Sequence, residues 1–496
     1  MNPLRWTLLA LLATSSPAPI ISDGSFNDWP SVPVTLRDPA DAPQAALDFG
    51  EIRVTHDPRF VHLLIDFGRV VNPRSLDGVF GILFDADGNP ATGWTEHGLP
   101  GVDLRVEFSP PQTGGVQLES ASGRFSSYEA GLQLAPTYAA RRAEIRLDRG
   151  ARLGSGAPLF LGARFSVKFV FTDPQGRVID ETDPIVHPLT SARVSRDAPG
   201  PDPLKHAPGT AFRVLSWNVG GKAVLTRPDP FRRILTALDP DLLLLDEVSS
   251  EASALWVQRL IGTQWQVVFS ANGGRQRTVV AARRAVTPVS SLLRIDYPPE
   301  ESQTILSLLP DPERRATLAR AHTEGIPTLG ATVQFHDRRL LAVALDLQCC
   351  GDRPGGPEDR IRLMEVNAIH AAVRQALTAG NFDALLVAGD FNLVASRDPL
   401  DRLAASLDLD GSPLSLAEPL QLNGLSNATW LRRGSPFPPG RLDYVLYSDS
   451  SLRLLHSFVF RSTDLPTRWL RRHHLQPDDS DVASDHLPLV SDFQWR

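Results

Sequence analysis

The stretch "ALLVAGDFN", residues 384–392, decides the expected fold of the second half of the chain. Its first five residues are apolar, which is typical of a strand buried on both faces of a sheet. It ends in Gly389, Asp390 and Asn392, and a glycine here lets the backbone approach a ligand closely. The stretch therefore predicts a buried strand that carries two polar side chains to the edge of a sheet, although Asp and Asn in an ordinary turn would give the same pattern.

Other stretches of the second half have the same character and alternate with helical patterns. The strand candidates are "FRVLSWNV" (212–219), "DLLLLDEV" (241–248), "LDYVLYS" (442–448) and "HLPLVSDF" (486–493). Between them, "PEDRIRLMEVNAIHAAVRQAL" (357–377) opens on proline and acids, as helices often do. Interleaved strands and helices predict an α/β domain with helices outside packed sheets.

The first half alternates short apolar and polar runs between Gly, Pro and Asp clusters, which predicts an antiparallel β-sandwich. A chain of 496 residues is too long for one ordinary core. We expect a sandwich at residues 20–186, a proline-rich linker at 187–210 and the α/β domain at 211–496.

The N-terminus combines one arginine, a short apolar run and small residues, which is typical of a signal peptide over residues 1–18. An apolar end of a cytosolic protein would look similar. No later run has the roughly 18 apolar residues of a membrane helix. We therefore expect a secreted or periplasmic bacterial protein without a transmembrane segment. The adjacent Cys349 and Cys350 are expected to be small apolar residues at a strand end, because neighbouring Cα atoms are too close for an unstrained disulfide. A metal or redox role is the alternative.

The polar residues at the strand ends supply the groups of metal-assisted phosphoryl chemistry. Glu247 suits a Mg²⁺ ligand, and Asp390 could hold or deprotonate the attacking water with Asn392 steadying it. His486, held by Asp443, could stabilise charge on the phosphoryl oxygens, and Asp485 could bind the ion or the water. Each residue alone has an explanation as a turn or cap, but together they favour one site.

"SWNV", "DLLLLDEV", "LLVAGDFN", "RLDYVLY" and "SDHLPLV", in this order, resemble the endonuclease/exonuclease/phosphatase superfamily, which includes deoxyribonucleases. The resemblance spans roughly residues 211–496. It implies a four-layered α/β sandwich, dependence on Mg²⁺ or Mn²⁺, and phosphoester hydrolysis. The residues on the family's active-site positions are Asn218, Glu247, Asp390, Asn392, Asp443, Asp485 and His486.

Two positions depart from the family pattern. Asp246 stands where Gln is usual, and Asp346 stands where many members have a histidine that contacts the phosphate. An anion beside a phosphate is repulsive unless a cation lies between them. Either Asp346 helps to hold a metal ion, or the strand is shifted and Gln348 faces the site instead.

Three further residues are candidates for substrate binding. Arg360 and Arg362 could reach a phosphate from the start of the predicted helix, or they could be solvated arginines on its surface. Thr429 lies where relatives often place a threonine before the Asp443 strand.

"DGSFNDWP" (23–30) and "FDADGNPATGW" (84–94) resemble the family 9 carbohydrate-binding-like sandwich. Asp85, Asp87 and Asn89 alternate as calcium ligands do, but a hairpin turn would use them equally well. Trp29 and Trp94 could stack on sugars or belong to the core. A surface glycan is the partner that this resemblance implies.

The leading interpretation is an exported, divalent-metal phosphodiesterase that acts on DNA or RNA. The net charge of −7 gives no basic face for a polyanion, so phosphate would be met through the metal ion. The alternative enzyme hydrolyses a phospholipid, as sphingomyelinases do, or a sugar or inositol phosphate. A third interpretation is a catalytically dead surface-binding protein.

Overall fold

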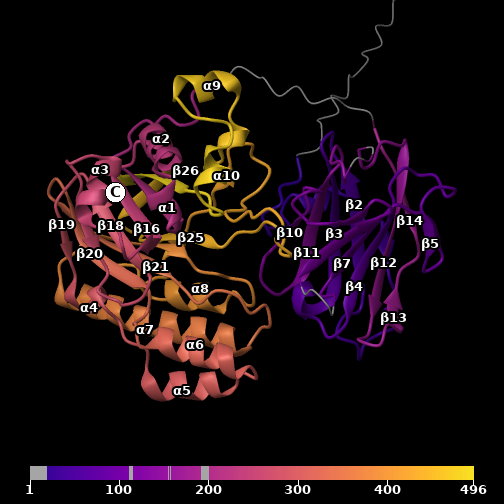
Figure 1. Cartoon of the computed structure of the whole chain (residues 1–496), viewed down its shortest axis with the longest axis horizontal. Coiled ribbons are helices and arrows are strands. Elements are labelled where there is room, and N and C mark those ends of the chain that lie inside the picture. Colours follow the sequence, from indigo (N-terminus) through magenta and orange to yellow (C-terminus); the bar gives the residue numbers. More distant parts are fainter. Residues whose placement is uncertain (1–18, 111–114, 155, 157, 191–199) are drawn as a thin grey trace, which may run out of the picture.

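The computed structural model describes residues 19–110, 115–154, 156, 158–190 and 200–496. The expected signal peptide of residues 1–18 lies outside these ranges. A β-rich first half and an α/β second half lie side by side (Figure 1). No helix of the described ranges is long and apolar enough to cross a membrane.

Two sheets form the first half, and every strand pair in them is antiparallel. One contains, in spatial order, β1 (Leu36–Arg37), β2 (Glu51–His56), β3 (Phe60–Val71), β11 (Ala140–Asp148) and β10 (Gln133–Ala135). The other contains β13 (Val178–Glu181), β12 (Arg164–Thr172), β4 (Val79–Asp85), β7 (Leu104–Phe108), β8 (Val116–Ser120) and β9 (Gly123–Phe125), with β14 (Ile185–Pro188) also paired to β12. A small hairpin joins β5 (Trp94–Glu96) and β6 (Leu99–Val102).

The core of this half lies between its two sheets because alternate residues of each strand point inward. Phe80, Ile82 and Phe84 of β4 meet Phe165 and Phe169 of β12 in one buried cluster. The expected antiparallel sandwich is confirmed.

Two mixed sheets form the second half. The first contains β17 (Gln266–Phe269), β18 (Gln276–Ala282), β16 (Leu242–Ser249), β15 (Phe212–Gly221), β27 (Leu489–Trp495), β26 (Leu452–Val459) and β24 (Leu420–Gln421). The second contains β19 (Val286–Pro288), β20 (Thr328–Phe335), β21 (Arg338–Asp346), β22 (Ala384–Asp390), β25 (Asp443–Tyr447) and β23 (Ser415–Leu416).

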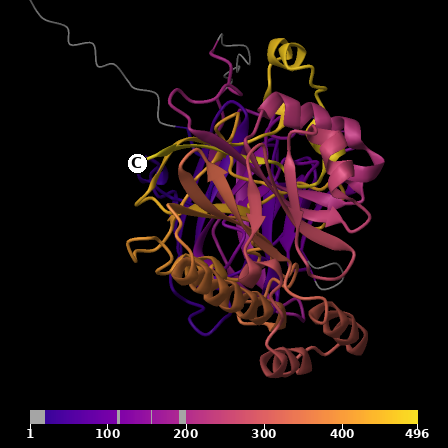
Figure 2. The ribbon, with the colours of Figure 1, turned by 90° about the vertical axis from the view of Figure 1, so that its left-hand side faces the viewer.

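Helices cover the outer faces of both sheets (Figure 2). The α-helices are α1 (Ala223–Thr226), α2 (Pro228–Leu238), α3 (Ala254–Ile261), α4 (Ser290–Leu293), α5 (Pro299–Ser307), α6 (Pro312–His322), α7 (Pro357–Ala379), α8 (Asp398–Ala404), α9 (Thr467–Arg472) and α10 (Asp479–Ala483). Short 3₁₀ turns are η1 (Trp29–Ser31), η2 (Pro73–Ser75) and η3 (Ser462–Asp464).

Three apolar clusters separate the layers of this half. One packs α4, α5, α7 and α8 against the β21–β22 sheet, another packs α2 and α3 against the β15–β16 sheet, and the third fills the space between the sheets. The order helix, sheet, sheet, helix is the expected four-layered α/β fold, which is confirmed.

Strand register brings the polar strand ends to one edge. Asp346 of β21 pairs with Asp390 of β22, which pairs with Asp443 of β25. Gly389 has φ +147, and a Cβ there would lie 1.9 Å from the carbonyl oxygen of Leu345. A side chain at this position would therefore push the two strands apart.

The expected linker of residues 187–210 does not run free along its described part. Leu204 is buried in the core of the α/β half, and the Asp202 carboxylate lies 3.0 Å from His473 Nε2. Residues 200–210 therefore pack on the second domain.

Candidate active site

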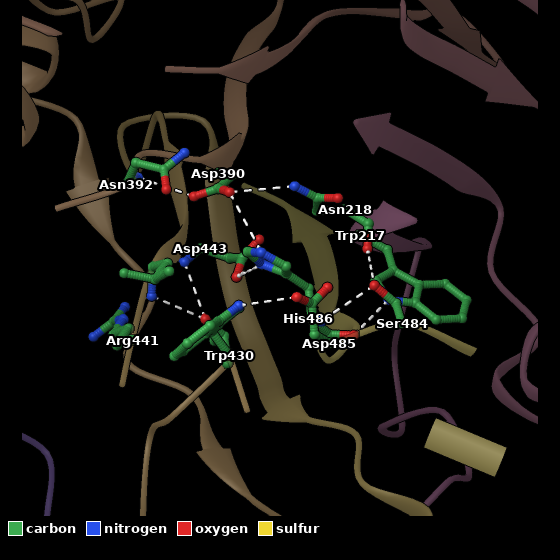
Figure 3. Close-up of polar contacts among 12 residues, drawn as sticks. Trp217, Asn218, Asp390, Asn392, Trp430, Arg441, Asp443, Ser484, Asp485 and His486 are labelled. Carbon is green, nitrogen blue, oxygen red and sulfur yellow. Dashed lines mark hydrogen bonds and ion pairs between the residues drawn. The ribbon is translucent and has the colours of Figure 1, made fainter. Parts of the chain in front are cut away.

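Four buried side chains form a continuous polar chain across the ends of the two sheets (Figure 3). Asn218 Nδ2 donates to Asp390 Oδ2 at 3.2 Å. His486 Nε2 lies 3.6 Å from the same oxygen, and His486 Nδ1 lies 2.9 Å from Asp443 Oδ2. Residues from β15, β22, β25 and the segment before β27 thus converge on one point.

The histidine of this chain is held in its protonated form. Burial alone would lower the pKa of His486, but Asp443 and Asp390 outweigh it and raise the pKa to about 10. Burial, together with Asp443 and against the pull of His486, raises the pKa of Asp390 well above its usual range. The site therefore contains a positively charged hydrogen-bond donor, His486, next to Asp390, a carboxylate that is more basic than usual.

Asn392 fixes the start of the loop after β22. Its φ of +49 is in the left-handed region, which asparagine tolerates better than most residues. Its backbone N–H donates to Asp390 Oδ1 at 2.9 Å, and its side-chain Nδ2 donates to the carbonyl of Leu347 at 2.9 Å. The backbone of Asn392 therefore holds one oxygen of the Asp390 carboxylate in place.

Asp346, rather than Gln348, faces the site. Asn392 Nδ2 lies 3.5 Å from Asp346 Oδ1, whereas Gln348 Nε2 turns to the carbonyl of Cys349 at 2.8 Å. Burial first, and then Asp390 and Glu247, raise the pKa of Asp346 well above its usual range. An extra carboxyl group is thus present at this position, and its buried surroundings disfavour its charged form.

Glu247 lies at a break in the strand ladder. Its φ is +51, and the pairing of β16 with β18 shifts between Leu245 and Val248. Gln276 Nε2 donates to Glu247 Oε2 at 2.5 Å. The break turns the carboxylate into the pocket that also contains Asp390.

Asp246, next to Glu247 in β16, was not among the expected active-site residues. It is 0% exposed, and within the described part of the chain neither carboxylate oxygen forms a hydrogen bond to another side chain. Burial and the charges of Asp390 and Asp443 raise its pKa well above the usual range. A Cβ on Gly389 would lie 2.9 Å from Asp246 Oδ2, so the glycine leaves room for this carboxyl group.

This donor set fits a divalent cation. Asp390, Asp443 and His486 each offer an atom, and these atoms lie within 4.8 Å of one another. Glu247, which lines the same pocket as Asp390, offers a further carboxylate near this cluster. Carboxylate oxygens are the ligands that Mg²⁺ and Mn²⁺ prefer, and a cation would relieve their mutual repulsion.

Residues close to the predicted active-site residues fix the backbone or side chains of those residues through hydrogen bonds. Ser484 Oγ donates to the carbonyl of Asn218 at 2.9 Å, and Trp217 Nε1 donates to the carbonyl of His486 at 2.8 Å. Trp430 Nε1 donates to Asp485 Oδ2 at 3.3 Å. Trp217 and Ser484 belong to the "SWN" and "SDH" stretches, so the sequence could have indicated that they lie beside the site. No sequence pattern indicated this for Trp430.

A pocket of about 610 Å³ opens over this chain, and Glu247, Asp390, Asn392, Asp485 and His486 line it. Exposed Arg227 and Arg432 line it as well, and neither guanidinium has an ion-pair or hydrogen-bond partner among the described residues.

Other parts of the pocket wall come from elsewhere in the chain. Arg74 and Thr137 of the β-sandwich line it, and so do the free cysteines Cys349 and Cys350, whose sulfur atoms are 3.0 Å apart.

The predicted substrate-binding residues lie elsewhere. Arg362 is 0% exposed and donates to the carbonyls of Gln348, Cys350 and Gly351, so it neither reaches a phosphate nor is solvated. Arg360 is exposed and donates to the carbonyl of Gly355. These contacts correct both expectations for Arg362, while Arg360 remains a surface arginine outside the pocket lining.

Thr429 has a positioning role instead of a substrate contact. It is 0% exposed, and its Oγ1 accepts the backbone N–H groups of Leu442 at 3.0 Å and Asp443 at 3.1 Å. It therefore fixes the start of β25 and the carboxylate that holds His486.

In the β-sandwich, Asp85, Asp87 and Asp103 bring carboxylate oxygens within 4.8 Å of one another. Asn89 does not join them as a ligand, because its backbone N–H donates to Asp85 and Asp87 and its side-chain oxygen accepts from Ala91. Trp29 is 1% exposed and cannot stack on a sugar. The contacts of Asn89 are those of a turn residue. A calcium site in this loop would use Asp103, not Asn89, as its third ligand.

Comparison with known proteins gives the family. A model of the Endonuclease/Exonuclease/phosphatase family matches residues 215–486, more than half of the 496 residues, and does not extend to the β-sandwich. No curated protein matches the chain by sequence.

Solved structures resemble part of the chain. The human Nocturnin catalytic domain with bound sulfate is 18% identical, with a TM-score of 0.36, over 57% of this chain and 94% of its own. The 3′ phosphatase NExo from Neisseria, bound to a product DNA hairpin, is 18% identical, with a TM-score of 0.36, over 57% of this chain and 100% of its own. An endonuclease/exonuclease/phosphatase from Bacteroides vulgatus is 11% identical, with a TM-score of 0.38, over 57% and 99%.

Proposed function

The chain belongs to the endonuclease/exonuclease/phosphatase family of phosphoesterases, and from this premise we propose that it hydrolyses phosphodiesters with the help of Mg²⁺ or Mn²⁺. The observation that carries the proposal is the polar chain Asn218–Asp390–His486–Asp443 at the floor of a pocket. It supplies a base and a positively charged donor within one bond network.

The roles of the residues follow from their contacts. Asp390, whose basicity is raised by burial, accepts a proton from the attacking water, while Asn218 and Asn392 hold its two oxygens in place. His486, kept protonated by Asp443, donates to the phosphoryl oxygens where charge develops. A divalent cation near Glu247 would polarise the phosphoryl group when bound.

Nucleic acid is the first substrate class that we propose. A phosphodiester backbone presents further phosphates next to the one under attack, and the unpartnered Arg227 and Arg432 are available at the pocket to bind them. Arg227 is immediately before α2, and Arg432 is in the loop before β25, so the two could bind neighbouring phosphates.

A phosphoester with a smaller body is the second candidate, such as a phospholipid head group or a sugar or inositol phosphate. The β-sandwich lines part of the pocket through Arg74 and Thr137, and a volume of about 610 Å³ is in the range of small-ligand sites.

A substrate panel decides between them. The full chain is incubated with Mg²⁺ or Mn²⁺ and supercoiled plasmid, an RNA oligonucleotide, sphingomyelin vesicles and an inositol phosphate, each with a matched EDTA control. We expect metal-dependent cleavage of the plasmid or the RNA. Turnover of lipid or inositol phosphate with both nucleic acids intact would select the second candidate, and no turnover of any phosphoester would overturn the proposal.

Export and the role of the sandwich are proposals of the same kind. We propose a secreted or periplasmic protein because of the composition of residues 1–18, and glycan binding by the sandwich because of its resemblance to carbohydrate-binding domains. The mass of the protein recovered from its own cells tests export, since an intact N-terminus would contradict cleavage. Retention on a glycan array tests the second proposal.

A further inference from the structure

The loop that follows the catalytic strand β22 is held by the β-sandwich. Thr137 Oγ1 lies 2.8 Å from the carbonyl of Leu393 and 3.1 Å from the carbonyl of Arg441. The backbone N–H of Ala139 donates to the carbonyl of Ala395 at 2.8 Å. The sandwich therefore grips both the loop after Asn392 and the segment before Asp443.

A second group of contacts grips the same loop from η2. Asn72 Nδ2 lies 2.6 Å from the carbonyl of Val394, and Arg74 Nη2 lies 3.0 Å from the same oxygen. Asn72 Nδ2 is also 2.9 Å from the carbonyl of Asp352. We call Asn72, Arg74 and Thr137 the sandwich clamp.

The side chains of the clamp are mostly buried and closely packed. Asn72, Arg74 and Thr137 are 3%, 6% and 8% exposed. A Cβ on Gly440 would lie 2.1 Å from Thr137 Cγ2, so the glycine permits the contact. Hydrogen bonds to buried backbone carbonyls are costly to lose, because the carbonyl is left without a partner.

The gripped segments are next to groups of the active site. Leu393 follows Asn392, which orients Asp390, and Arg441 lies two residues before Asp443, which holds His486. The backbone N–H of Phe391 donates to the carbonyl of Leu442 at 2.9 Å, which ties the two segments together. The Thr137 hydroxyl thus lies within hydrogen-bond distance of the segment after Asp390 and of the segment before Asp443, and its single proton donates to one of the two carbonyls at a time.

We propose that the sandwich clamp positions the catalytic loop, so that the β-sandwich is a working part of the phosphoesterase site rather than an independent module. This inference rests on the proposed function of the pocket. Thr137 and Asn72 are positioning residues, because they touch backbone and act through Asn392 and Asp443. Small displacements of such groups lower the rate of the chemical step far more than they weaken substrate binding.

Thr137→Val in the full chain tests the proposal, since valine keeps the shape and removes the hydroxyl. We expect kcat on a phosphodiester to fall by about 10–100-fold with KM within about twofold of wild type. Thr137→Ser should restore kcat. Asn427→Ala is the matched control, because Asn427 Nδ2 also donates across the interface, to the carbonyl of Asp23 at 2.7 Å, without contacting the loop.

Hydrogen exchange provides a readout that does not need activity. Amides of residues 391–395 should exchange faster in Thr137→Val than in wild type or Asn427→Ala. If Thr137→Val does not fold, Asn72→Ser takes its place, because serine can still accept from the N–H of Arg74 as Asn72 does.

The outcomes separate the two proposals. Unchanged kcat in Thr137→Val, a rise in KM alone, or an equal loss in Asn427→Ala overturns the clamp. If wild type hydrolyses no phosphodiester, the proposed function is wrong, and the exchange of residues 391–395 still decides the clamp: faster exchange confined to the clamp variants supports it, and equal exchange overturns it.

Discussion

At the scale of single residues, the site is a crowded set of acids around one protonated histidine. Among the described residues, no side chain donates a hydrogen bond to Asp246, and burial together with neighbouring carboxylates raises the pKa of Asp246, Asp346 and Asp390. A raised carboxyl pKa means that the charged form costs stability at neutral pH. A bound cation would relieve the repulsion among these buried carboxylates. Removing one carboxylate should therefore lower activity and raise the stability of the metal-free protein.

Asp390→Asn should show both effects. We expect kcat to fall by about 10²–10⁴-fold, because the base is lost. The thermal midpoint of the protein in EDTA should rise, because a buried negative charge disappears. Steady-state kinetics and calorimetry measure the two, and full activity in the variant would contradict the role of Asp390.

Asp346→Asn should weaken the binding of the metal ion. If Asp346 is a ligand or stabilises the ion from nearby, the Kd for Mn²⁺ should rise by about tenfold or more. Isothermal titration calorimetry measures this, with exposed Asp410→Asn as the control. An unchanged titration would remove Asp346 from the metal site.

The strand-end positions could be read from the sequence, whereas the environment of Asp246 could not. Asn218 and Asp390 are polar groups at the end of apolar runs, and His486 is one at the start of an apolar run. The surroundings of the Asp246 carboxyl depend on β22 of the facing sheet, where Gly389 leaves the space, and no local pattern carries that information. Arg362 was misjudged for the same reason, since its burial among backbone carbonyls follows from the path of residues 348–351.

At the scale of elements, strand pairing explains why distant motifs meet. The predicted strands at 212–219, 241–248 and 384–392 correspond to β15, β16 and β22, and the predicted helix corresponds to α7. Apolar periodicity sets these elements, so sequence could predict them. It could not predict the shift in register at Glu247, because a bulge is decided by the facing strand β18.

A histidine pair joins the two sheets of the sandwich and predicts a pH dependence. His56 Nδ1 of β2 lies 2.9 Å from His187 Nε2 of β14. Burial, reinforced by His56, lowers the pKa of His187 to about 4, and burial lowers that of His56 as well. The unfolded chain, with histidine pKa near ~6.5, takes up these protons first, so stability is complete above that pH and is lost as pH falls toward 4.

The measurement is the thermal midpoint of the sandwich unfolding transition between pH 7.5 and 4. His187→Gln should flatten this dependence relative to wild type. The same slope in both proteins would show that the pair does not contribute.

At the scale of the whole molecule, the docking of the sandwich on the α/β domain is the feature that sequence hid most completely. Its contacts are made largely to backbone carbonyls of Leu393, Val394 and Leu425, which any residue type could provide. Composition indicated two domains and their order along the chain. It carried no information that Asn72, Arg74 and Thr137 would line the catalytic loop.

The central claim is that Glu247, Asp390 and His486 act with a divalent cation on a phosphodiester. The most direct measurement is the rate of hydrolysis of bis(p-nitrophenyl) phosphate by wild type and Glu247→Gln as Mn²⁺ is added after EDTA. We expect negligible turnover in EDTA, recovery with Mn²⁺ in wild type, and little recovery at the same Mn²⁺ concentrations in Glu247→Gln. Equal rates with and without the metal ion, or equal recovery of both proteins, would contradict it.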